Sequence, residues 1–242
     1  MMPYKNFLIS LFFLASCSRE ISENDQNLSE LIQPSQNYYS SQYQCTLNKK
    51  NNLNDLEQYI PKLSTLLRNH NFGYELDFYF SDRQNEEIKN FIINVKSNKT
   101  IKQDALGLFI NSENNIFQCL QKNNNLLGTT LISKIDQQKD IFFVEILDCE
   151  FILDSNFGTF KIVSDYFYNL LNDYKISYKA DFLNSDTGSL NFYWYNFFNS
   201  IPDRDNFYKN WVDSEDSIEI KDLFSEQSTC FSSNSYIGYK VY

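Results

Sequence analysis

The sequence predicts an α+β protein built from two tandem repeats, each with an antiparallel sheet. The first observation behind this is an internal repeat, because Cys149–Asp186 aligns without a gap on Cys45–Asp82, 104 positions earlier. The second is that each copy places helically spaced apolar residues between two strand-like runs. The third is composition, since 22 Phe and 17 Tyr among 242 residues can bury a large core.

The first repeat, residues 42–133, is predicted to contain strands and helices in the order strand, helix, strand, strand, helix, strand. Its first helix begins after Asn52, whose side chain can cap free amides, and its apolar residues lie on one face. Pro61 within this helix predicts a kink or a later start. The remaining elements are expected at Tyr43–Leu47, Tyr74–Phe80, Ile88–Val95, Thr100–Ile110 (a helix), Ile116–Leu120 and, after a turn at Asn123–Asn125, Leu126–Ile132.

The second repeat, residues 139–242, follows the same order. Asn156 is the expected cap of its first helix, and a second helix is expected around Phe207–Val212. The strand Leu190–Phe198 has apolar residues on both faces, which predicts helices on one side and another sheet on the other. Its other strands are expected at Ile141–Leu153, Ile176–Leu183, Thr229–Ser232 and Tyr236–Tyr242.

This element order is the ferredoxin-like pattern, in which the first and fourth strands of a sheet are neighbours. Each repeat has one cysteine on each of these two strands, which predicts the disulfides Cys45–Cys119 and Cys149–Cys230. Each would contribute about 4 kcal/mol on the chain-entropy model. The other two connectivities would link the halves. With one histidine and no closely spaced cysteines, we expect no metal site.

Two such halves in one chain resemble the dimeric α+β barrel superfamily in its fused form. The resemblance implies two sheets that face each other, with helices outside. That superfamily includes cofactor-independent monooxygenases and haem enzymes. A haem needs an axial ligand, and His70, the only histidine, lies at the polar end of the first helix. We therefore expect no cofactor.

The N-terminal residues predict where the protein is located in the cell. Residues 1–16 have a short charged start and a short apolar core, as secretory signals do. The ending Leu-Ala-Ser-Cys resembles the lipobox of bacterial lipoproteins, which implies an acylated Cys17 as the first mature residue. An ordinary signal peptide is the alternative. Ser18 resembles the outer-membrane sorting signal of Gram-negative lipoproteins, so the outer membrane is favoured over the inner. Residues 17–41 are polar and predict a flexible tether.

The net charge limits the classes of partner that the protein can bind. The formal net charge of −10 argues against nucleic acid, so the membrane, reached through the lipid anchor, is the one partner that the sequence indicates. The acidic run at 213–216 lacks the ligand rhythm and glycine of a calcium loop, and a solvated loop is the expectation.

Two groups of side chains are candidates for a site. Asp77 and Asp181 occupy equivalent positions in the middle of strands, where they could share a proton or a cation as a catalytic pair. The favoured interpretation is instead that both face solvent at a strand edge. Tyr193, Trp194 and Tyr195 could line an apolar pocket between the sheets, although core packing is again favoured.

From these observations we expect a lipid-anchored envelope protein with a binding or structural role rather than catalysis. The alternative is an enzyme or small-molecule-binding protein that uses the cavity between the two sheets. A cavity holding the aspartates or tyrosines would favour the alternative, and a closed aromatic core would favour the first.

Overall fold

The computed structural model confirms the α+β class and the two tandem halves. It describes residues 38–70, 73–82, 89–101, 115–135, 138–174, 176–185 and 189–241. The predicted signal peptide, Cys17, most of the tether and all but the first two residues of the predicted helix at 100–110 lie outside them. The first half contains β1 (Tyr38–Leu47), α2 (Leu53–His70), β2 (Glu75–Ser81), β3 (Asn90–Ser97) and β4 (Phe117–Ser133). The second half contains β5 (Ile141–Phe151), α4 (Phe157–Asp173), β6 (Lys179–Asn184), β7 (Asn191–Phe198), α5 (Ile201–Asp213), α6 (Glu215–Ser225) and β8 (Ser228–Lys240).

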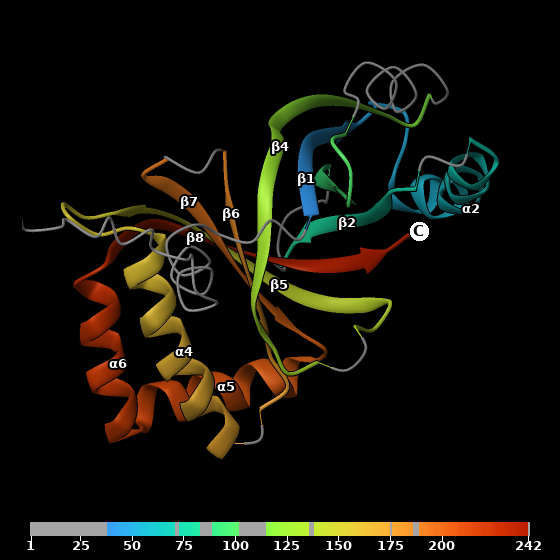
Figure 1. Cartoon of the computed structure of the whole chain (residues 1–242). Helices are drawn as coiled ribbons and strands as arrows, with labels where there is room; N and C mark the ends of the chain where they lie inside the picture. The colour runs from blue at the N-terminus through green and yellow to red at the C-terminus, as the bar shows by residue number, and fades with distance from the viewer. Residues whose placement is uncertain are drawn as a thin grey trace, which may run out of the picture.

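The strands form one closed antiparallel barrel in the order β1-β3-β2-β8-β5-β7-β6-β4. Within each half the fourth strand pairs with the first, the first with the third, and the third with the second, as the ferredoxin-like pattern requires. The pairs β2–β8 and β4–β6 join the two halves. Helix α2 lies outside the first half, and α4, α5 and α6 lie together outside the second (Figure 1).

The fourth strand of each half is longer than predicted because it pairs with strands of both halves. The expected turn at Asn123–Asn125 lies inside β4, where Asn125 has a φ of 46° and the register against β1 shifts. The expected strands at 229–232 and 236–242 are likewise parts of β8. A β-bulge bends a strand without ending it, so polar turn residues marked a bend rather than a reversal.

Two further boundaries differ from the prediction. Strand β1 begins at Tyr38, so the last four residues of the predicted tether are part of the barrel. The acidic run is the junction of two helices and not a loop, since Glu215 and Asp216 form the first turn of α6. Carboxylates are favourable there because the amides of a helix N-terminus are unsatisfied and carry partial positive charge.

The predicted helix caps are confirmed. The Asn156 side chain accepts hydrogen bonds from the amides of Gly158 and Thr159, and Thr159 bonds back to Asn156. Asn52 accepts from the amides of Asn54 and Asp55 in the same way. Each cap of this kind contributes about 1 kcal/mol to helix stability. Helix α2 starts at Leu53 and includes Pro61.

Alternation along the strands separates three cores. One packs beneath α2, and a second packs beneath α4, α5 and α6. The third fills the barrel and contains nine buried residues: Tyr79, Ile92, Leu126, Phe142, Val144, Ile146, Leu183, Tyr195 and Phe197. Both faces of β7 are therefore covered, as its sequence predicted.

Both predicted disulfides are present. Cys45 and Cys119 are direct partners across β1 and β4, and Cys149 and Cys230 are partners across β5 and β8. The glycines Gly128 and Gly238 also occupy matching places, each facing an aromatic ring of the first strand of its half. A Cβ atom at Gly238 would lie 2.3 Å from the Phe142 ring, so close packing requires glycine there.

Candidate functional site

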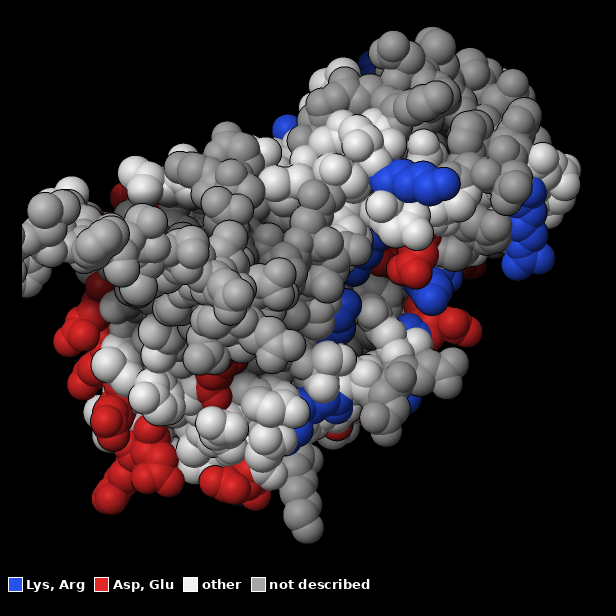
Figure 2. Space-filling model, viewed as in Figure 1, with Lys and Arg blue, Asp and Glu red and all other residues white. Residues whose placement is uncertain are grey.

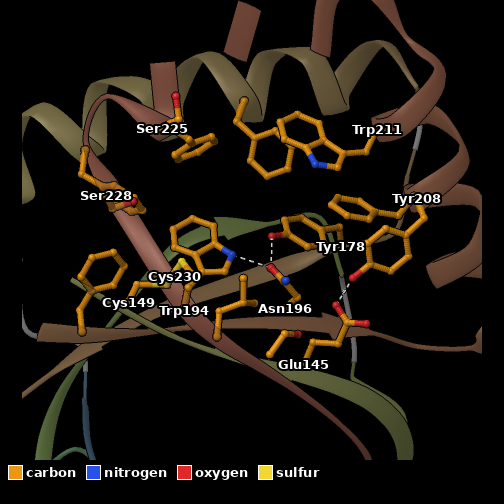
Figure 3. Close-up of a pocket in the computed structure, with 17 residues that line it drawn as sticks. Glu145, Cys149, Tyr178, Trp194, Asn196, Tyr208, Trp211, Ser225, Ser228 and Cys230 are labelled. Atoms are coloured by element: carbon orange, nitrogen blue, oxygen red, sulfur yellow. Dashed lines mark hydrogen bonds between the residues drawn. A yellow bond between two sulfur atoms is a disulfide. The ribbon is translucent and has the colours of Figure 1, made fainter. Parts of the chain in front are cut away.

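An aromatic cavity of about 270 Å³ lies between the sheet of the second half and its three helices. Strands β5, β7 and β8 form its floor, and α4, α5 and α6 form its roof (Figure 3). The rings around it are contributed by both layers: Phe160, Phe167, Tyr178, Phe192, Trp194, Phe207, Tyr208, Trp211 and Phe224. Such rings bury a large apolar area and hold a flat molecule by stacking and edge contacts.

A hydrogen-bonded group stands on the floor of this aromatic cavity. The Asn196 Oδ1 atom accepts from the Tyr178 hydroxyl and from the Trp194 Nε1 atom, each at 2.5 Å. The Asn196 side chain is buried, so these bonds offset the cost of removing it from water. They also orient the Trp194 ring toward the cavity (Figure 3).

A second polar group closes one end of the cavity. The Tyr208 hydroxyl on α5 donates to the buried Glu145 carboxylate on β5. Burial and the adjacent Glu145 carboxylate raise the pKa of Tyr208 well above its ordinary value, so the phenol keeps its proton at neutral pH. Ser225 and Ser228 lie toward the other end (Figure 3). The cavity therefore combines apolar walls with polar groups at defined positions, which is the usual composition of a small-molecule site.

The described lining does not fit a haem. An axial ligand must come from histidine, thiolate, methionine or tyrosinate. The described lining has no histidine or methionine, and its two cysteines are joined in a disulfide. The pKa values of Tyr178 and Tyr208 are both raised by burial, so neither phenol is ready to ionise. No cluster of three His, Cys, Asp or Glu side chains within the described ranges could hold a metal ion. The side chain of His70, at the end of α2, is outside the described structure.

The three aromatic residues predicted to share a pocket do not share one. Trp194 lines the aromatic cavity, whereas Tyr195 is fully buried inside the barrel, with Tyr193 on the same side. Neighbouring strand residues point to opposite faces, so a run of three cannot line one cavity. The roof residues on α5 and α6 were not predicted, because helical periodicity shows which side chains are buried and not what they face.

The expected solvent exposure of Asp77 and Asp181 is wrong. Asp77 is 6% exposed and Asp181 is 0% exposed, because the second strand of each half is paired on both sides. An edge strand in one sheet becomes an interior strand once the long fourth strand of the other half pairs with it. The two aspartates therefore belong to the interior of the barrel.

Asp181 is the centre of a buried ionic network. Its carboxylate accepts hydrogen bonds of 2.7 Å from Tyr38 and Thr130 and of 3.0 Å from Lys179, and the Lys96 ammonium lies 3.8 Å away. Burial acts to raise the pKa of Asp181, but the two ammonium groups and the hydroxyl donors outweigh it, and the pKa is lowered. Asp181 is therefore ionised at neutral pH.

The pKa of the Asp77 carboxyl is shifted in the opposite direction to that of Asp181. Burial raises its pKa, and Lys96 and Lys240 only partly oppose this effect. Within the described part of the chain, Asp77 makes no ion pair comparable with those of Asp181. The two equivalent aspartates thus have pKa values shifted in opposite directions.

The barrel, the covering helices and the aromatic cavity together define the chain as a protein of the dimeric α+β barrel fold. No protein-family model and no curated protein sequence matches it.

Solved structures share the fold. A chlorite dismutase from Candidatus Nitrospira defluvii, in complex with imidazole, is 7% identical, with a TM-score of 0.54 over 89% of this chain and 96% of that one. A candidate monooxygenase from Fusobacterium nucleatum subsp. nucleatum is 7% identical, with a TM-score of 0.50 over 85% of this chain and 93% of that one. At this identity the likeness concerns the fold.

Proposed function

We propose that the protein binds a small, flat, largely apolar molecule in the aromatic cavity, as a binding protein or an enzyme. The observation that carries the proposal is the cavity itself, which is lined by aromatic rings from both the sheet and the covering helices. The two fold neighbours named above, a chlorite dismutase and a candidate monooxygenase, support the use of this fold for small substrates. This is closer to the alternative expected from the sequence, an enzyme or small-molecule-binding protein, than to the favoured binding or structural role. The aromatic cavity lies between a sheet and its helices, however, and not between the two sheets.

The polar groups restrict the proposed ligand. The hydrogen-bonding side chains around the cavity include the Tyr208–Glu145 pair, the Asn196 amide and the three serines Ser225, Ser228 and Ser233. A ligand with one aromatic ring system and a hydroxyl or amine group at its edge would match them. An anionic ligand would lose its hydration against apolar walls and would meet the Glu145 carboxylate, so we expect neutral ligands to bind more tightly than anions.

The ligand proposal can be tested by tryptophan fluorescence. The chain has two tryptophans, and both line the aromatic cavity. Addition of 4-nitrophenol below its own pKa should quench this fluorescence and saturate, and calorimetry should give the same dissociation constant. The Leu147→Phe variant, which adds volume at the floor, should weaken binding at least tenfold. The matched Leu120→Phe variant, at a residue that is 81% exposed on β4, should bind as the wild type does. Equal binding by both variants would contradict the assignment.

We also propose that the protein is anchored in the bacterial envelope by lipid at Cys17. The support is the resemblance of Leu14-Ala15-Ser16-Cys17 to a lipobox. Within the described residues, no helix combines the length and apolar character needed to span a bilayer. Intact mass of the protein from native membranes should show an acylated Cys17, and Cys17→Ala should move the protein to the soluble fraction. A Cys17→Ala protein that stays in the membrane would refute this anchor.

A further inference from the structure

A second cavity, of about 340 Å³, opens at one end of the barrel, where the two halves meet. Its described lining comes from both halves and is mostly polar: Tyr38, Gly73, Glu75, Asp77, Lys96, Ser97, Asn98, Thr130, Gln138, Lys179 and Lys240. Three of these are lysines, in a chain with a net charge of −10. Figure 2 shows basic side chains around the hollow between the halves and acidic ones over α4–α6.

Lys96 is the residue that needs a partner in this cavity. Its side chain is 10% exposed, and its ammonium nitrogen makes no hydrogen bond to any described residue. The nearest contacts are the Asp181 Oδ2 atom at 3.8 Å and the ring centroids of Phe197 at 4.8 Å and Tyr38 at 5.4 Å. An ammonium has three N–H donors, and buried charges are normally hydrogen-bonded. Among the described side chains the donors of Lys96 therefore have no acceptor at hydrogen-bond distance, and the ammonium is open to the cavity.

Asp181 does not supply that acceptor, because its Oδ2 atom, at 3.8 Å from the Lys96 nitrogen, is beyond hydrogen-bond distance and already accepts from Tyr38 and Lys179. The Asp181 carboxylate thus lies between the Lys96 and Lys179 ammonium groups, both of which lie over the Phe197 ring. Lys240 adds a third positive charge to the cavity lining. The three ammonium groups face the carboxylates of Asp181, Glu75 and Asp77, so the cavity is positive when Asp77 is protonated. The Lys96 donors are directed at the cavity in either case.

We propose that this cavity binds a small oxyanion, a carboxylate or a phosphate group, through the Lys96 ammonium with Lys179 and Lys240 beside it. The oxygen atoms of such an anion supply the acceptors that Lys96 lacks, and charge-assisted hydrogen bonds of this kind are short and strong. Asp77 and Glu75 in the same lining limit the positive charge, so singly charged anions should bind best. This site is separate from the aromatic cavity, and it does not depend on the ligand proposed there.

Binding of phosphate, which stays an anion in mild acid where acetate takes up a proton, should strengthen as pH falls through the titration of Asp77. The groups that act on Asp77 are Lys96, Lys179 and Lys240, which favour its charged form, and Glu75 and burial, which oppose it; the Tyr79 hydroxyl also lies beside it. Because burial raises the pKa of Asp77, its protonation above the ordinary range removes a negative charge beside the anion. The Asp77→Asn variant should bind the anion more tightly at neutral pH and lose this pH dependence.

The test is calorimetric titration of the full-length protein with sodium acetate and, separately, with sodium phosphate at constant ionic strength. Either probe should bind with one site per chain, and the stronger one identifies the class of anion. Lys96→Met should weaken binding at least tenfold, and Lys240→Met, at the rim, should weaken it less. Lys161→Met, which removes an exposed lysine paired with Asp165 on α4, should have no effect.

Two results would overturn the oxyanion proposal. One is that neither acetate nor phosphate binds saturably to a wild-type protein that circular dichroism shows to be folded. The other is binding that Lys96→Met and Lys240→Met leave unchanged. If Lys96→Met fails to fold, Lys240→Met and Asp77→Asn decide the question, because they must change affinity in opposite directions.

Discussion

Replacing Asp181 with asparagine should lower the free energy of unfolding by about 3–5 kcal/mol, because it leaves two buried ammonium groups without a charged partner. The loss is expected to be large because the carboxylate bonds to residues on β1, β4 and β6, and its ion pair extends to β3. These strands belong to both halves, so the network also holds the barrel closed. Urea unfolding at pH 7 measures the difference.

The matched control is Asp165→Asn. Asp165 pairs with Lys161 on the surface of α4, where both side chains are partly exposed. Such an i,i+4 pair contributes about 0.3–0.5 kcal/mol, so this variant should unfold almost as the wild type does. A loss for Asp181→Asn no larger than that of the control would show that the buried network does not stabilise the fold.

The pH dependence of stability gives an independent check on Asp181. Its pKa in the folded protein is lowered from 3.8, so its stabilising effect is complete above that value. The effect is lost as pH falls from about 3.8 through the lower folded pKa, because the folded state then must take up the proton. Asp77 acts in the opposite direction, since its raised pKa makes protonation favour the folded state. Asp181→Asn should remove the first effect and keep the second.

Removing either disulfide should lower the free energy of unfolding by about 4 kcal/mol on the chain-entropy model, since each closes a long loop. The cysteines are 74 residues apart in the first half and 81 in the second, so the two losses should be nearly equal. The double variants Cys45→Ala/Cys119→Ala and Cys149→Ala/Cys230→Ala test this by urea unfolding. A loss of less than about 1 kcal/mol in both variants would contradict the chain-entropy account, which gives several times that value.

The two disulfides should differ in their rate of reduction. Cys45 and Cys149 are fully buried and Cys119 is 7% exposed, whereas Cys230 is exposed on β8. A thiolate must reach a sulfur atom to open the bond, so Cys149–Cys230 should be reduced first. Dithiothreitol treatment, alkylation and peptide mass spectrometry measure the order. In urea the order should disappear, and earlier labelling of Cys119 in the folded protein would contradict the expectation.

The equivalent aspartates show how one repeated residue acquires two roles. Both lie at the same place in the repeat, and both are buried. Asp181 meets Tyr38, Thr130 and Lys179, and its charge is stabilised. Asp77 lies on a strand that pairs with the end of β8 near Lys240, and its charge is disfavoured. Only the contacts made by the other half distinguish them.

The sequence by itself determined the local elements and the symmetry of the fold. Helical spacing of apolar residues, the caps Asn52 and Asn156 and the paired aromatic strand faces each predict structure within a short segment, and the structure confirms them. The repeat adds the strand order, from which both disulfides follow. These predictions succeed because they depend on neighbours along the chain or on one well-defined sheet order.

The tertiary structure alone decided which side chains share a cavity. The extended strands β4 and β8 pair across the halves, which changed both aspartates from expected surface residues into buried ones. The tertiary structure also placed the Lys96 and Lys179 ammonium groups over the Phe197 ring, and it placed Trp194 and Tyr195 in separate cores. Closure of the barrel sets these contacts. They join residues far apart in the chain, so no local pattern of apolar and polar residues encodes them.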